Sequence, residues 1–177
     1  MEESNVYELI GGIVIVIFAL LGFYKGAIMS TLYFLGTLFS IWIAHRLYQP
    51  FSKHLDLFIP FPKTVAYDTH YVIQFDDPSN QFTKLIGFIL IIIVVKVLLR
   101  LLMSSMSRVL DTFQRPLLSR LFGVILGVGT GFIVLHFLFY IFALYPSDLL
   151  QSAMKASLGA QKIVLDMPFL SNITLNL

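Results

Sequence analysis

The chain has 177 residues, of which 58% are hydrophobic and 12% are charged, and its formal net charge is +2. Soluble domains carry about 25% charged residues, so this composition excludes an ordinary soluble domain and predicts an integral membrane protein. The small net charge argues against nucleic acid as a partner, and the lack of cysteine excludes disulfides, thiolate nucleophiles and cysteine-ligated metals. At this length the chain is predicted to form a single membrane domain over residues 1–177.

Four long apolar stretches account for most of the chain, and they cover residues 9–24, 27–44, 85–103 and 121–145. Each approaches or exceeds the ~20 residues that a helix needs to cross ~30 Å of hydrocarbon. A spanning segment must satisfy its backbone hydrogen bonds internally, as a helix does. The predicted fold is therefore an all-α, polytopic membrane protein with four transmembrane helices, an extracytoplasmic loop over 46–82 and a tail over 146–177.

Basic residues near the ends of these stretches indicate the orientation in the bilayer. Lys25 follows the first stretch. Arg100 lies near the end of the third stretch, and Arg108, Arg115 and Arg120 follow it in the connection to the fourth. Cytoplasmic loops are enriched in Lys and Arg, and anionic lipid headgroups attract such residues. Both turns are therefore predicted to face the cytoplasm of a bacterial membrane. The acidic start of the chain is unlike a cleavable signal, so we expect a retained first helix and two extracytoplasmic termini.

The first two stretches are joined by the short segment Gly22-Phe23-Tyr24-Lys25-Gly26, which predicts a tight antiparallel hairpin. In the second stretch, small residues recur every four positions, at Gly36, Ser40 and Ala44. Such a face lets another helix approach closely inside a bilayer.

The predicted outer loop ends at Asp77-Pro78, where an N-cap carboxylate and a proline at the first helical position are expected to start the third helix. Four side chains in this region could gather a cation: Asp68, His70, Asp76 and Asp77. Their spacing matches neither an EF-hand nor a zinc site. The sequence therefore predicts no metal site and no cofactor.

Lys96 and Arg100 lie one turn apart on one face of the third stretch. An unpaired cation in the middle of a bilayer costs roughly 3 kcal/mol on insertion scales. If the helix ends near Met103, the lysine side chain can extend to the cytoplasmic boundary as an anchor. If the helix continues, Lys96 must face the interior of the bundle or water.

The fourth stretch carries Gly123, Gly127 and Gly131 at four-residue intervals. This glycine face is interpreted as a close packing seam within or between protomers, with a narrow pore as the alternative. His136 lies about one turn past the middle of the same stretch. A proton relay would need titratable partners, so we expect His136 to bond to a hydroxyl of the second stretch, such as Thr37 or Ser40.

The tail is predicted to form an amphipathic helix from Ser147 through Gly159 on the outer surface. Leu150, Met154 and Leu158 are spaced every four residues and define its apolar face. The residues from Pro168 onward form a second apolar segment that is too short to span the membrane.

Two segments carry a family resemblance. They are Lys25-Gly26 followed by a small-residue helix through Gly36, and Ser119-Arg120-Leu121-Phe122-Gly123 leading into Gly127 and Gly131. Both resemble the colicin V production protein (CvpA) family, and the long aromatic outer loop is similar to that of its Gram-positive members. Many relatives have an Arg-Glu pair where this chain has Met29-Ser30, so a mechanism that uses that carboxylate is not carried over. The resemblance implies motif positions at Lys25, Gly26, Arg120, Gly123 and Gly127, but no catalytic residue.

The resemblance implies a cytoplasmic-membrane protein with an accessory or scaffold role in toxin (bacteriocin) production or export. Its expected partners are the lipid bilayer and other membrane proteins or further copies of the chain. The alternative is a small oligomeric channel or transporter, which a wet cavity uniting Lys96, Arg100 and the glycine face would favour. An enzyme is not expected, because the predicted spans carry neither a carboxylate nor a His-Glu metal motif.

Overall fold

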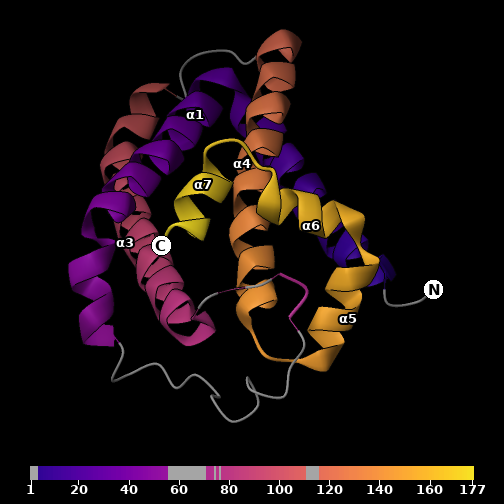
Figure 1. Ribbon diagram of the computed structural model, residues 1–177. Coiled ribbons are helices and arrows are strands. Elements are labelled where there is room, and N and C mark those ends of the chain that lie inside the picture. Colours follow the sequence, from indigo (N-terminus) through magenta and orange to yellow (C-terminus); the bar gives the residue numbers. More distant parts are fainter. Residues whose placement is uncertain (1–3, 56–70, 74, 76, 111–115) are drawn as a thin grey trace.

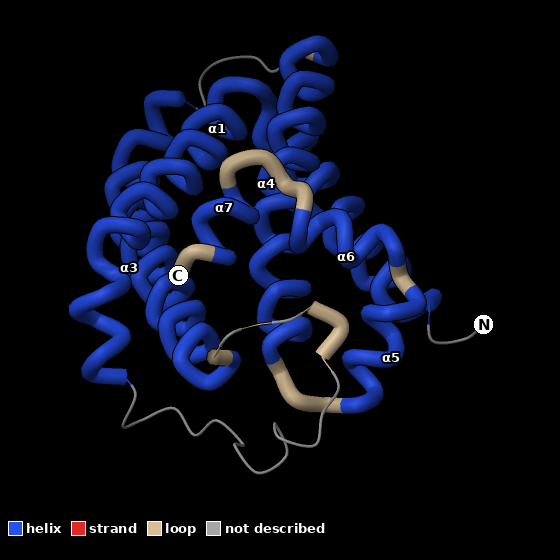
Figure 2. The backbone as a smooth tube through the Cα atoms, in the orientation of Figure 1, coloured by secondary structure: helices blue, strands red, loops and turns tan. Residues whose placement is uncertain are grey.

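The computed structural model describes residues 4–55, 71–73, 75, 77–110 and 116–177 (Figure 1). Its long helices are α1 (Ser4–Leu55), α3 (Pro78–Leu110) and α4 (Leu117–Leu144). The tail forms α5 (Asp148–Ala156), α6 (Leu158–Leu165) and α7 (Leu170–Leu175). In Figure 2 the described residues form helices and loops, without a strand. The all-α class is thus confirmed for this part of the chain.

Among the described residues, three helical segments are long and apolar enough to cross a membrane, whereas the sequence predicts four spans. They are Val6–Ser52, Pro78–Ser104 and Leu117–Leu144. The difference arises because α1 contains both of the first two apolar stretches and is interrupted only at Gly26. Gly26 has φ 71° and ψ 178°, a conformation that glycine adopts easily because it lacks a Cβ atom.

Gly26 divides α1 into a first leg, residues 4–25, and a second leg, residues 27–55. Close contacts with α4 fix the directions of the two legs. In the first leg, Gly22 contacts Gly123 and Phe18 contacts Gly127. Gly26, at the junction, also contacts Gly123, and Phe34 of the second leg contacts Gly129. The first leg therefore runs antiparallel to α4 and the second leg parallel to it. The chain reverses direction at Gly26, and Figure 1 shows this reversal where the indigo part of α1 meets the purple part.

Helix α3 begins where the Asp77-Pro78 pair predicts. The Asp77 side chain accepts a hydrogen bond from the Asn80 N–H at 3.1 Å, which satisfies one of the free donors of the first turn. The helix then runs antiparallel to the second leg of α1. Tyr48 packs against Phe88 with their ring centroids 6.2 Å apart.

The tail differs from the predicted surface helix. Helix α5 ends at Ala156, and the Ser157 hydroxyl accepts a hydrogen bond from the Ala160 N–H at 3.2 Å, which starts α6 as a new helix. As a result, Met154 is fully buried while Leu158 is 72% exposed. The two leucines and the methionine of the expected apolar face therefore do not share one helix face.

The end of the tail packs against α3 and α4. Figure 1 shows α7 between α3 and α4, and Leu170 and Leu177 are both buried. Lys84 of α3 donates a hydrogen bond to the main-chain carbonyl of Leu177. Non-helical backbone at membrane depth is tolerated where protein surrounds it. The end of the tail therefore contacts both α3 and α4.

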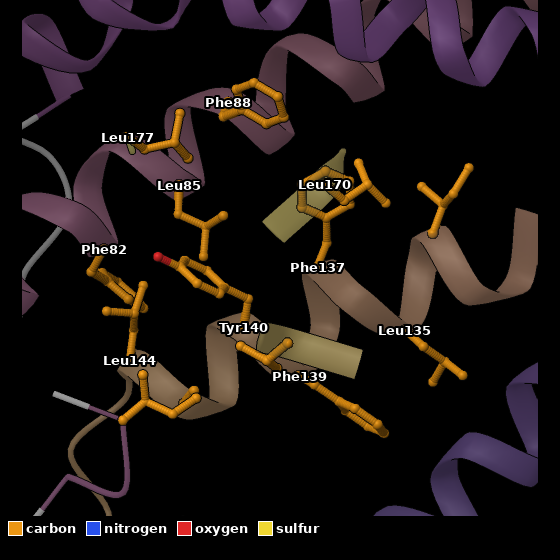
Figure 3. Close-up of a cluster of buried hydrophobic side chains, with 14 of the residues drawn as sticks. Phe82, Leu85, Phe88, Leu135, Phe137, Phe139, Tyr140, Leu144, Leu170 and Leu177 are labelled. Carbon is orange, nitrogen blue, oxygen red and sulfur yellow. The ribbon is translucent and has the colours of Figure 1, made fainter. Parts of the chain in front are cut away.

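Aromatic and aliphatic side chains from α1, α3, α4 and the tail form the core. Figure 3 labels its members from α3, α4 and the tail. Its members include Leu85, Phe88, Tyr140 and Leu170, and the tail closes it on one side. The outward faces of the long helices are also apolar, with Val16, Val94 and Ile125 more than half exposed. Because so much apolar surface is unfavourable in water, hydrocarbon is the solvent that fits this exterior.

Candidate functional site

A cavity of about 100 Å³ lies between both legs of α1, α3 and α4. Its polar lining combines two lysines with four hydroxyl groups: Lys25, Lys96, Ser30, Tyr33, Thr37 and Thr130. Gly22 and Gly127 belong to the same wall. The site thus unites Lys96 and part of the glycine face in one place, near the reversal of the chain at Gly26.

The two lysines come from different helices. Lys25 lies at the end of the first leg of α1, and its Nζ is 3.5 Å from the centroid of the Tyr33 ring, a favourable cation–π arrangement. Lys96 and Arg100 of α3 both repel the Lys25 ammonium. Helix α3 continues to Leu110, past the predicted end near Met103, and Lys96 faces the interior of the bundle. Arg100 is exposed one turn further along.

The three aliphatic hydroxyls of the cavity bond to main-chain carbonyls. Ser30 donates to Gly22 at 3.3 Å, Thr37 to Tyr33 at 2.8 Å and Thr130 to Leu126 at 2.9 Å. Each hydroxyl thereby uses its single proton and keeps oxygen lone pairs that can accept from water or from an ammonium. The cavity wall therefore suits a hydrated, cationic interior.

The glycines of α4 lie against the first leg of α1. A Cβ atom built on Gly123 would be 2.2 Å from the Gly22 carbonyl oxygen, and one built on Gly127 would be 2.3 Å from the Phe18 carbonyl oxygen. At Gly131 the nearest atoms, 3.2 Å away, belong to the side chains of Ile15 and Phe18. Backbone thus meets backbone at the first two positions, and we call this contact the glycine seam, formed by Gly22, Gly123 and Gly127.

Gly36 packs less tightly than the glycine seam. A Cβ atom on Gly36 would be 3.5 Å from Leu99 of α3 and 3.8 Å from Met103. These are ordinary van der Waals distances, so the contact between the second leg and α3 has space for a methyl group.

The segments that carry the family resemblance touch at the reversal of α1. The Ala27 N–H, directly after Gly26, donates to the Ser119 hydroxyl at 3.0 Å. Arg120 lies over the Phe23 ring, with its guanidinium carbon 5.6 Å from the ring centroid. The structure therefore brings the Lys25-Gly26 turn and the start of α4 into one contact region.

His136 is fully buried, and its partners differ from the predicted ones. Its Nδ1 lies 2.7 Å from the Ile163 carbonyl oxygen and its Nε2 lies 3.0 Å from the Thr174 hydroxyl. Thr37 and Ser40 instead bond to carbonyls of their own helix. The prediction of a partner in the second stretch was wrong, because the tail packs against α4 and supplies the hydrogen-bond partners of both ring nitrogens.

Only one of the four residues considered for a metal site is described by the structure. Asp68, His70 and Asp76 lie outside the described residues, and Asp77 caps α3. The described residues contain no group of three or more His, Asp or Glu side chains that could hold a metal ion.

Several residues of these sites were not assigned their roles from the sequence. Gly22 forms a small-xxx-small pair with Gly26, a spacing typical of close helix contacts, and this pair could have indicated the seam. Tyr33, Thr130 and Thr174 carry no comparable signal, because a single hydroxyl in an apolar helix does not reveal which helix it faces.

The sequence model of the family described as "Colicin V production protein" matches residues 7–167. The chain belongs to this family. The uncharacterized transmembrane protein YshB of Bacillus subtilis (strain 168) is a relative, 27% identical over 154 residues that cover 87% of this chain and 86% of YshB. No solved structure matches the chain. As a member of the colicin V production protein family, the chain is a membrane protein with transmembrane helices, and the family's name provides the link to bacteriocins.

Proposed function

We propose that this protein is a four-span scaffold or accessory protein of the bacterial cytoplasmic membrane that serves toxin production or export. In this proposal the two legs of α1 cross separately, and α3 and α4 supply the other two spans. The turn at Gly26 and the start of α4 face the cytoplasm, and both termini lie outside. The residues proposed to define this family architecture are Lys25, Gly26, Gly36, Arg120, Gly123, Gly127 and Gly131.

The observation that supports a scaffold is the glycine seam. Backbone atoms of α1 and α4 meet there without any intervening side chain, and dispersion forces make such close contacts favourable in lipid. Further along the bundle, α7 lies between α3 and α4 (Figure 1). A protein closed in this way offers rigid apolar outer faces to membrane partners or to further copies of itself.

The alternative, a small channel or transporter, is favoured by a different observation. Lys96 and Lys25 line a polar cavity beside the glycine seam, and intramembrane cations often mark substrate or ion paths. The cavity lies near the Gly26 end, whereas the core shown in Figure 3 fills the space between α3, α4 and the tail. Conduction would require that core to open.

The orientation can be tested with single cysteines, because the natural chain has none. Tyr24, near the reversal, is 71% exposed, and Leu149, just after α4, is 76% exposed. We expect an impermeant thiol reagent to label Leu149→Cys in intact cells and to label Tyr24→Cys only after permeabilisation. The reverse pattern would contradict the proposed orientation.

The Lys96→Leu variant separates a scaffold from a channel. An apolar residue is favoured over lysine at membrane depth by several kcal/mol, so the variant is expected to insert and fold. For a scaffold, it should restore bacteriocin release to a producing strain that lacks the wild-type protein, as wild type does. Reconstituted vesicles should show no protein-dependent ion flux with either protein.

A flux that requires the protein and changes with Lys96→Leu would establish the channel instead. Lys162→Leu is the matched control, since Lys162 is exposed on α6 and lies outside the cavity. If bacteriocin release is the same with and without the protein, the proposed role in toxin production is wrong.

A further inference from the structure

The cavity near Gly26 holds positive charge that no acidic side chain balances. Its lining, as far as the structure describes it, contains Lys25 and Lys96 but no carboxylate, and the exposed guanidinium of Arg100 adds to the positive potential felt at Lys25. The charges that face the cavity thus come from both α1 and α3 and share one sign.

Lys96 has no protein partner within the described part of the chain. Neither a hydrogen bond nor an ion pair joins its ammonium to any of those residues. At 1.5 Å per residue, Lys96 lies about 12 Å along α3 from Ser104, where the apolar span ends. An uncompensated cation at such a depth is costly, so an anion or water must compensate its charge.

The donors that remain free converge on the cavity from two helices. Besides the two ammonium groups, the Tyr33 hydroxyl makes no hydrogen bond within the described residues. This set consists of several donors around a small volume, which fits an anion with several acceptor oxygens better than a monatomic ion.

We propose that this cavity binds a phosphate group between Lys25 and Lys96. A volume of about 100 Å³ accommodates a group of that size and is far below the roughly 300–1,000 Å³ of pockets for drug-sized ligands. Free phosphate and the headgroup of an anionic lipid share this chemistry. Basic pockets between transmembrane helices on the cytoplasmic side commonly hold lipid headgroups. The site is independent of whether the protein acts as a scaffold.

The test uses the full chain purified in a neutral detergent. One arm measures the thermal unfolding midpoint in inorganic phosphate and in chloride at equal ionic strength. The second arm incubates the protein with phosphatidylglycerol or with phosphatidylcholine and counts retained lipids by native mass spectrometry. Both arms compare the wild type with Lys96→Gln, Lys25→Gln and the control Lys162→Gln, which removes the same charge from an exposed position on α6.

We expect the wild type and Lys162→Gln to gain several degrees in phosphate or to retain phosphatidylglycerol selectively, and both cavity variants to lose that response. A response to inorganic phosphate identifies free phosphate as a ligand, whereas lipid retention alone identifies the headgroup. Removing a charge at membrane depth favours insertion, so Lys96→Gln should remain folded. Its thermal unfolding midpoint in chloride checks that it does. The absence of both responses in the wild type, or an unchanged response in Lys96→Gln, overturns the proposal.

Discussion

Replacing Gly127 with leucine is expected to destabilise the folded bundle by more than about 3 kcal/mol, above the usual range for overpacked sites. The first atom of any side chain at this position would lie 2.3 Å from the Phe18 carbonyl oxygen. Main chain cannot rotate out of the way as a flexible side chain can, so α4 and the first leg of α1 must separate. We expect the unfolding midpoint in detergent to fall by about 2–4 °C for each kcal/mol lost.

Gly12→Leu is the matched control for this prediction. Gly12 lies in the same first leg of α1, but a Cβ atom there has no neighbour within 4 Å. Gly12→Ala should be neutral or slightly stabilising, since alanine is favoured over glycine in a helix by about 1 kcal/mol. Gly127→Ala should still be destabilising. Equal midpoints for the variants at positions 12 and 127 would show that the glycine seam carries no packing role.

The long helices could be predicted from sequence because their signals are local. Apolar length indicated the three described helices that are long enough to cross a membrane. Asp77-Pro78 marked the start of α3 through a hydrogen bond three residues away. The short link before Gly26 indicated a hairpin, although only Gly26 itself leaves the helical conformation. Each of these features depends on neighbouring residues, so a single sequence contains the relevant information.

The cavity and the tail depended on contacts between distant segments. Lys25 and Lys96 come together only because both legs of α1 pack beside α3 and α4. Lys96 had two possible environments from sequence, and the choice between them depends on how far α3 continues and which face it turns inward. Similarly, the periodic spacing of Leu150, Met154 and Leu158 suggested one helix, whereas Ser157 divides that segment by capping α6.

Breaking the bond between His136 and Thr174 is expected to loosen the tail. The Ile163 carbonyl can only accept, so Nδ1 of His136 carries the proton. Nε2 is then an acceptor for the Thr174 hydroxyl, whose single proton is shared with the Leu170 carbonyl 3.0 Å away. Thr174→Val keeps the shape of the side chain but leaves the buried Nε2 unpaired, at a cost of about 1–3 kcal/mol. The unfolding midpoint should therefore fall.

A double-mutant cycle can assign this loss to the bond itself. His136→Leu combined with Thr174→Val replaces both partners by apolar groups, so the double variant should lose less stability than the sum of the single variants. Thr37→Val provides the comparison, because the one partner of the Thr37 hydroxyl among the described residues is the Tyr33 carbonyl of its own helix. Its effect should add to that of His136→Leu without coupling. Coupling to Thr37 in place of Thr174 would mean that the histidine bonds to the second leg of α1 and that the tail does not occupy the space between α3 and α4.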